Sequence, residues 1–388
     1  MAKARFLALA LLLMALAGSV PAGESVLQET LPNGIRILAV HQTGDSQVLF
    51  VFLPLGLTSD PSGGAQWSHL LEHLVIRSTH PLGSDDANGE TLPDHMRLDL
   101  YGRAADLDSQ LASARKWLAG PAFATETIRV ECGRMNQEVD YAVKNRVAHK
   151  FAVAAWNQAF RHGRSRVAVR SEPARATPAQ LAELYAARSG PLVCVGGPVP
   201  AETSLNRARK ALADLKLPRG KVARAGKPAA GPIHWDLPVH HTLLIWPIPG
   251  PEHPDHPALM LLGPTVMVAA SQDRGWTAGP LVAGADLFTP EGCFFYASYT
   301  GPVALRARVE GYLARPRAPW GAASSLADSL TRVQPAGGAN AVLQLAMAEY
   351  RYGPRRSAVA SGLSRADLEA AARRYLTSER AACWELVP

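Results

Sequence analysis

Length, composition and charge exclude several classes of protein. The chain has 388 residues and a hydrophobic fraction of 47%, which supports a substantial core and argues against a disordered chain. Its formal net charge is +7, but no run of Lys and Arg is interleaved with aromatic residues, so nucleic acid is not an expected partner. The length accommodates two domains or one large one.

The N-terminus has the pattern of an export signal. Lys3 and Arg5 precede an apolar run over residues 6–20, and Val20-Pro21-Ala22 is a small-residue cleavage site. Residues 1–22 are therefore predicted to be a signal peptide, and the protein is expected in the periplasm or outside the cell. The alternative is an uncleaved anchor, although the apolar run is short for a membrane span. No membrane span is expected in the mature chain.

Hydrophobic periodicity predicts a chain that mixes helices and strands. Strands are expected over residues 35–40, 46–53, 96–101 and 191–196, and helices over residues 65–76, 107–118, 125–147, 156–161 and 178–187. The stretch 216–232 is rich in Lys, Arg, Gly, Pro and Ala, which is typical of a linker.

Two histidines and a glutamate form the sequence His69-Leu70-Leu71-Glu72-His73 inside the predicted helix 65–76. At about 100° per residue, the three polar side chains share one face of a helix. Two imidazoles at this spacing can bind one zinc ion, which usually takes three protein ligands and keeps one position for water. The glutamate is then placed to accept a proton from that water. The order is that of the inverted zincins; the alternative is an ordinary helix with two histidines.

A third zinc ligand is expected to be a carboxylate on another helix. Glu131 and Glu138 lie seven residues apart in the predicted helix 125–147, so they differ by only about 20° around it and about 10 Å along it. Both can face the helix that carries the histidines, one near the ion and the other beside a ligand.

The second half of the chain echoes the first. Residues 179–195 resemble residues 366–384: Cys194 comes nine residues after Tyr185, and Cys383 comes eight residues after Tyr375. Residues 53–60 likewise resemble residues 246–255, but the second copy has no His-x-x-Glu-His. We therefore predict a first domain over residues 24–215 with the metal motif, a linker over 216–232, and a second domain over 233–388 without it.

Four cysteines are widely spaced, at Cys132, Cys194, Cys293 and Cys383. An exported protein can form disulfides, but four cysteines are few for this size. We expect mostly buried thiols, or at most one or two disulfides, and the spacing does not say which cysteines would pair. A zinc site made of all four is not expected, because no two of them are close in sequence.

These features together resemble the pitrilysin/insulysin family of zinc metallopeptidases. That family carries His-x-x-Glu-His and, later in the chain, a helix with two glutamates seven residues apart. Further matches are Leu31-Pro32-Asn33-Gly34, Asn88-Gly89-Glu90-Thr91 and residues 156–160. The resemblance covers most of residues 24–388 and is more specific in the first half. It implies an α+β fold of two similar α/β halves, each with an antiparallel-rich sheet and helices packed on one face.

The resemblance also implies a role for each residue of the metal motif. His69, His73 and Glu138 are the expected ligands of one Zn²⁺ ion. Glu72 is the expected general base, and Glu131 is expected to assist. The implied activity is that of a zinc metalloendopeptidase that hydrolyses peptides or small unfolded proteins.

Substrate and partners are implied by the same resemblance. A peptide is expected to add as a strand to the edge strand that follows Asn88. Arg274 matches by position a family arginine that contacts substrate, but Leu281 stands where the family often has a tyrosine. Some family members work as pairs of homologous subunits. The chain is therefore expected to be the zinc-bearing member of a homo- or heterodimer or a stand-alone enzyme; the alternative is a non-catalytic scaffold subunit.

Overall fold

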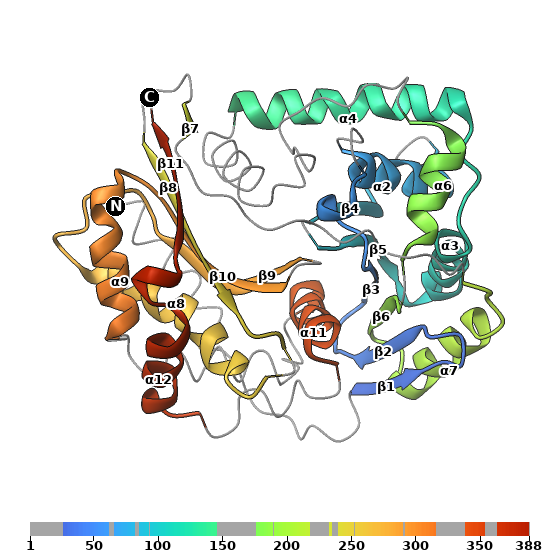
Figure 1. Ribbon diagram of the computed structural model, residues 1–388. Coiled ribbons are helices and arrows are strands. Elements are labelled where there is room, and N and C mark those ends of the chain that lie inside the picture. The colour runs from blue at the N-terminus through green and yellow to red at the C-terminus, as the bar shows by residue number, and fades with distance from the viewer. Residues whose placement is uncertain are drawn as a thin grey trace.

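The structure is a computed structural model with two β-sheets, each accompanied by its own helices (Figure 1). It describes residues 26–61, 66–81, 85–92, 94–145, 176–188, 190–217, 233–234, 240–251, 253–289, 292–315, 338–353 and 363–387. The predicted signal peptide, the predicted helix 156–161 and residues 218–232 of the predicted linker lie outside these residues. Within the described residues, no helix is both long enough and apolar enough to cross a membrane.

The first sheet has six strands in the order β1-β2-β6-β3-β5-β4. β2 and β6 pair in parallel, and every other neighbouring pair is antiparallel. β1 and β4 are the edge strands, and β4 lies beside the helix that carries the histidines. The strands are β1 (Val26–Thr30), β2 (Arg36–His41), β3 (Ser46–Leu53), β4 (Ala87–Thr91), β5 (Met96–Arg103) and β6 (Leu192–Gly197).

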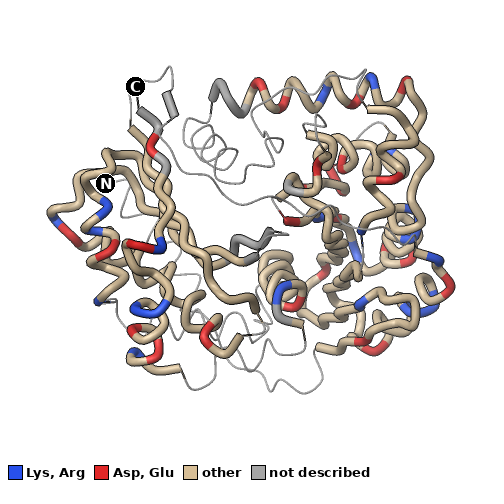
Figure 2. Tube along the Cα trace, in the orientation of Figure 1, with Lys and Arg blue, Asp and Glu red and all other residues tan. Residues whose placement is uncertain are grey.

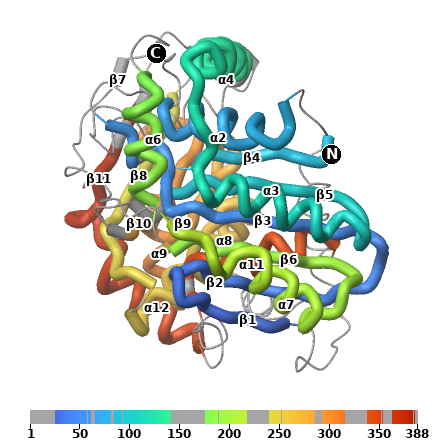
Figure 3. Tube along the Cα trace, turned by 90° about the vertical axis from the view of Figure 1, so that its right-hand side faces the viewer, coloured from blue at the N-terminus to red at the C-terminus, as the bar shows by residue number. Residues whose placement is uncertain are grey.

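Helices cover one face of this sheet, as Figure 1 and Figure 3 show. Alternate side chains of β3 and β5, such as Leu49, Val51 and Leu98, point to this face and form one buried core with the helices. α2 packs on β4 and β5, α3 on β3 and β5, and α7 on β1 and β2. The helices are α2 (Trp67–Arg77), α3 (Leu107–Ala119), α4 (Thr125–Asn145), α6 (Pro178–Ala186) and α7 (Ala201–Leu212).

The second sheet repeats the topology of the first. Its order, β7-β11-β8-β10-β9, matches β2-β6-β3-β5-β4: the first pair is parallel and the others are antiparallel in both. The predicted duplication and the α+β fold class are therefore confirmed. The strands are β7 (Ile233–His234), β8 (His241–Ile248), β9 (Val282–Thr289), β10 (Gly292–Thr300) and β11 (Ala382–Val387), and the helices packed with them are α8 (His256–Gln272), α9 (Arg306–Ala314) and α12 (Arg365–Tyr375).

A helix from the second half also belongs to the core of the first sheet. α11 (Gly338–Tyr352) packs against β3, β6 and β2, on the face that α2 leaves free, and lies between the two sheets (Figure 1). Its Val342 and Leu345 are fully buried against strand residues such as Phe50. Arg36 of β2 donates hydrogen bonds to the last carbonyls of α11. The two halves therefore share buried side chains, and the predicted boundary between them stays a prediction.

All four cysteines lie in the described part of the chain, and none of them forms a disulfide there. Cys132, Cys194 and Cys293 are buried, and Cys383 is half-buried. Burial raises the pKa of Cys293 to about 12, so its thiol stays protonated at neutral pH. These positions agree with the expectation of mostly buried thiols.

Replacing Leu345 by alanine tests whether α11 covers the first sheet. Leu345→Ala removes a fully buried side chain and is expected to lower the free energy of unfolding by about 2–5 kcal/mol, because a cavity remains in the core. Gln344→Ala, at an exposed position of the same helix, is the matched control and should be near neutral. Urea unfolding measures both, and equal effects would contradict the packing described for α11.

Candidate metal centre

The metal motif lies on α2, whose first turn is fixed by a buried carboxylate. Asp60 Oδ1 accepts hydrogen bonds from the backbone N–H of Ser68 at 2.7 Å and from its hydroxyl at 2.6 Å. These bonds satisfy a donor that an α-helix leaves unpaired at its N-terminus. Leu70, Leu71 and three more apolar side chains anchor the opposite face in the core. The polar face of α2 is therefore held at a fixed position relative to the sheet.

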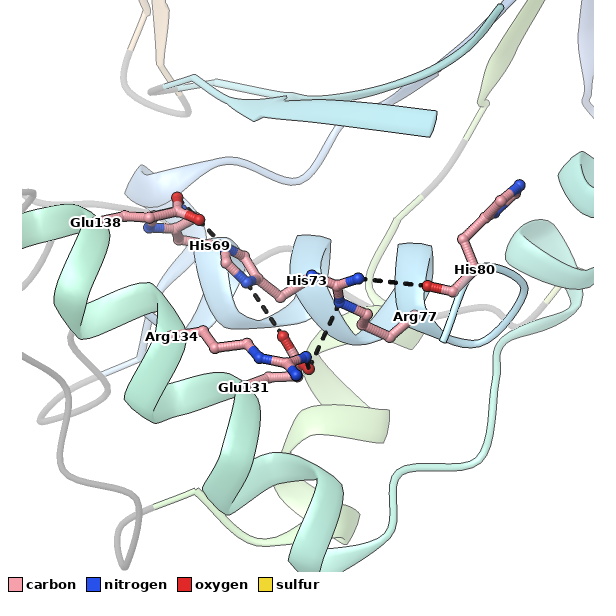
Figure 4. A network of polar contacts seen from close by, with 7 residues as sticks. All are labelled: His69, His73, Arg77, His80, Glu131, Arg134 and Glu138. Atoms are coloured by element: carbon pink, nitrogen blue, oxygen red, sulfur yellow. Dashed lines mark hydrogen bonds and ion pairs between the residues drawn. The ribbon is translucent and has the colours of Figure 1, made fainter. Parts of the chain in front are cut away.

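α4 crosses this polar face and brings Glu138 to both histidines. Glu138 Oε2 lies 3.7 Å from His69 Nε2 and 3.6 Å from His73 Nε2, and the two imidazole centroids are 5.0 Å apart. Figure 4 shows both rings pointing toward the α4 side chains. Within the described residues, these three side chains form a group whose donor atoms all lie within 4.8 Å of one another.

Glu131, seven residues before Glu138 on α4, is buried below this group. Glu131 Oε2 lies 3.4 Å from His73 Nδ1, and Oε1 contacts Arg77 at 3.6 Å and also pairs with Arg134 (Figure 4). Burial acts to raise the pKa of Glu131, but His73 and the two guanidinium groups outweigh it and hold the pKa below its usual value. Glu131 is therefore a permanent anion that can accept a hydrogen bond from the back of the His73 ring.

The two carboxylates also set the charge of the metal-free site. Burial acts to lower the pKa of His73, but its contacts with Glu131 and Glu138 raise it to about 9. The imidazoles of His69 and His73, each within 3.7 Å of Glu138 Oε2, hold the pKa of Glu138 well below its usual value. His73 is therefore protonated near neutral pH, and a metal ion that binds its imidazole must displace a proton.

Glu72 faces the edge strand β4 and does not join the three-residue group. Its side chain is buried, with 7% of the residue exposed, and burial raises its pKa. The hydroxyl of Thr91 donates a hydrogen bond of 2.6 Å to Oε2. A Cβ atom added at Gly89 would lie only 2.7 Å from Oε1. The backbone of β4 therefore passes directly beside the Glu72 carboxylate, and a larger residue at Gly89 would require the Glu72 side chain to shift.

The donor set fits a zinc ion. Zinc–nitrogen and zinc–oxygen bonds of about 2.0–2.2 Å in a tetrahedral site place neighbouring donor atoms roughly 3.3–3.5 Å apart. The observed separations of 3.6 and 3.7 Å exceed this by only a few tenths. Both Nδ1 atoms already have acceptors, at Gln66 for His69 and at Glu131 for His73, so both Nε2 atoms remain for a metal.

Two predicted site residues lie apart from this group. Asn88 is an exposed residue of β4, paired in register with Asp99 of β5, and its predicted contact with substrate stays a prediction. Arg274 follows α8 in the second half, and none of the contacts described for the metal group involves it. Leu281, at the position of the family tyrosine, is buried in the second core.

Sequence reasoning missed four residues that support the site: Gln66, Arg77, Thr91 and Arg134. The spacing of the two arginines is a usable signal, because Arg77 is one turn after His73 and Arg134 is three residues after Glu131. Thr91 lies within the Asn88–Thr91 motif, but its contact with Glu72 requires β4 to pass over α2. Gln66 has no signal beyond its position three residues before His69.

Comparisons with known proteins were made by sequence and by structure. No protein-family model and no curated protein sequence matches the chain. By structure, the chain is similar to a protease from Helicobacter pylori, with a TM-score of 0.76 and 15% identity over 94% of this chain and 100% of that one. It is also similar to an inactive peptidase M16 domain from Pseudomonas fluorescens, with a TM-score of 0.66 and 14% identity over 94% and 98% of the two chains.

A third similar structure is the periplasmic protease PqqL from Escherichia coli. The TM-score is 0.63 and the identity 14%, over 95% of this chain and 48% of that one, so this chain corresponds to about half of PqqL. At such identities the likeness shows the fold alone. The chain has the fold of M16-like peptidases, the pitrilysin type, and this fold includes proteases as well as a domain described as inactive.

Replacing the two α4 glutamates separately tests their different positions. Glu138→Gln is expected to reduce zinc binding strongly, because it removes the third ligand. Glu131→Gln should retain zinc with an affinity lower by about 10–100-fold, because it weakens the support of the His73 ring. Zinc titration of the two purified variants measures both values. The reverse order of affinities would show that the roles of the two glutamates have been exchanged.

Proposed function

We propose that the protein is a zinc-dependent endopeptidase that hydrolyses peptides or small unfolded proteins in the periplasm or outside the cell. The observation that carries this proposal is the convergence of His69, His73 and Glu138 beside a buried Glu72. The M16-like peptidase fold supports it. Export rests on the N-terminal sequence, with a periplasmic protease among the similar structures.

The chemistry divides between the ion and Glu72. When bound, zinc supplies Lewis-acid chemistry, which polarises a peptide carbonyl and makes water easier to deprotonate. Thr91 occupies Oε2 of Glu72, so Oε1 is the atom that accepts the proton of the attacking water. The pKa raised by burial brings the carboxylate closer to the working range of a general base. Glu72 then gives the proton to the nitrogen of the leaving amine.

The substrate is proposed to bind along β4. Among the described strands β4 is an edge of the first sheet, so one side of its backbone has no partner among them and can accept an extended peptide. The strand passes beside Glu72 at Gly89 and Thr91. A peptide added here would carry its backbone past the carboxylate and the metal group. Asn88 and Arg274 are proposed to contact this peptide.

The second candidate is a non-catalytic or partner-dependent subunit. Leu281 is apolar and buried where the family often has a tyrosine, so this position supplies no polar group to a substrate. Similarity to an inactive domain and to half of PqqL favours this candidate as well. A homologous partner would then complete the site. Zinc content separates the two candidates, because a scaffold has no need of a stoichiometric ion.

The substitution Glu72→Gln separates metal binding from catalysis. It keeps the size of the side chain but removes the base, so peptide cleavage should fall by about 10²–10⁴-fold or more while zinc content stays near normal. Glu126→Gln, an exposed residue of α4, is the control and should cleave normally. Zinc content and cleavage of a peptide library are measured on the same preparations. Undiminished cleavage by the Glu72 variant would refute the mechanism.

Removal of the metal is the complementary test. A chelator should abolish cleavage by the mature chain, and added zinc should restore it, because the polarising ion and its water are lost and regained together. The assay is run on the chain alone and with any co-encoded homologue. Cleavage that appears only with the homologue would identify the partner-dependent form, and zinc-free purified protein would favour the scaffold.

A further inference from the structure

Gln66, the N-cap residue of α2, has an unusual backbone conformation. Its φ is 64° and its ψ is 17°, in the left-handed region, and no other non-glycine residue in the described ranges has a positive φ. Side chains disfavour this region because Cβ approaches the neighbouring carbonyl oxygen. A glutamine in a backbone conformation suited to glycine therefore indicates that its side chain has a functional role.

The surrounding structure holds Gln66 in this conformation. Its carbonyl accepts a hydrogen bond of 2.8 Å from the N–H of Leu70, and the Asp60 carboxylate fixes the next turn through Ser68. The residue is 1% exposed, so its amide is enclosed and not a surface group. The helical turn that follows the strained position is therefore tied to buried parts of the fold.

This conformation directs the Gln66 amide to the first predicted ligand. Its Oε1 lies 3.0 Å from Nδ1 of His69. An amide oxygen can only accept a hydrogen bond, so the contact requires the proton of the neutral imidazole on Nδ1. Nε2 then has a free lone pair, and it is the nitrogen that faces Glu138.

We propose that Gln66 is a positioning residue that fixes the tautomer and ring orientation of His69 for metal binding, an inference that rests on the proposed zinc site. Glu131 does the same for His73 with a carboxylate. The amide is neutral, so it orients His69 without adding a further negative charge to a site that already contains Glu72, Glu131 and Glu138. The two histidines are thus oriented by acceptors of different charge.

Three substitutions separate this role from a structural one. Gln66→Met keeps the chain length and the left-handed backbone but removes the acceptor, and Gln66→Gly removes the acceptor and relieves the backbone. Both should bind zinc about 10–100-fold more weakly, the usual effect of losing a partner that orients a ligand. Gln66→Gly should nevertheless be at least as stable as the unmutated protein in thermal unfolding. Gln66→Glu keeps an acceptor at this position, so its zinc affinity should stay close to that of the unmutated protein.

The tautomer is measured directly in the metal-free protein by ¹⁵N NMR of labelled histidine, with the His69→Gln variant for assignment. The expected result is a proton on Nδ1 of His69 in the unmutated chain and loss of this preference in Gln66→Met and Gln66→Gly. A proton on Nε2, or unchanged zinc affinity in Gln66→Gly, would overturn the proposal. If the unmutated protein binds no zinc, the proposed function fails, and the tautomer measurement alone decides the role of Gln66.

Discussion

The contact between α2 and α4 is the constraint on which the site depends. A buried carboxylate, Glu131, lies between the helices and is neutralised by Arg77 of α2, Arg134 of α4 and His73. A buried anion is costly unless it is paired and hydrogen-bonded, so this cluster fixes the distance and rotation of the two helices. Two helical turns further along α4, the same geometry places Glu138 against both imidazoles.

The two halves of the duplicated fold carry helices of different character at equivalent positions. α2 and α8 occupy equivalent positions after β3 and β8, and each packs on its edge hairpin. α2 exposes a polar face with the metal motif, whereas α8 is apolar over most of its length and is buried in the second core. α4 carries both acidic and basic residues along its length (Figure 2). α11 is rich in apolar residues and packs on a sheet.

α11 covers only part of the first sheet. It covers β2, β3 and β6 on the face turned toward the second half, but β4 is not among the strands on which it mainly packs. β4, the edge strand next to Glu72 and the metal group, therefore lies outside the main contact with α11. Under the proposed function, an extended peptide would bind at β4, away from the strands that α11 covers.

The sequence by itself determined the features that depend on helical phase. The shared face of His69, Glu72 and His73 and the spacing of Glu131 and Glu138 follow from local periodicity. The duplication follows from the resemblance between residues 179–195 and residues 366–384. Only the tertiary structure showed that Arg77 and Arg134 meet at Glu131, that α11 covers the first sheet and that Gln66 is left-handed. These features depend on contacts between segments distant in sequence or on packing that forces an unfavourable backbone angle, and neither leaves a periodic pattern along the chain.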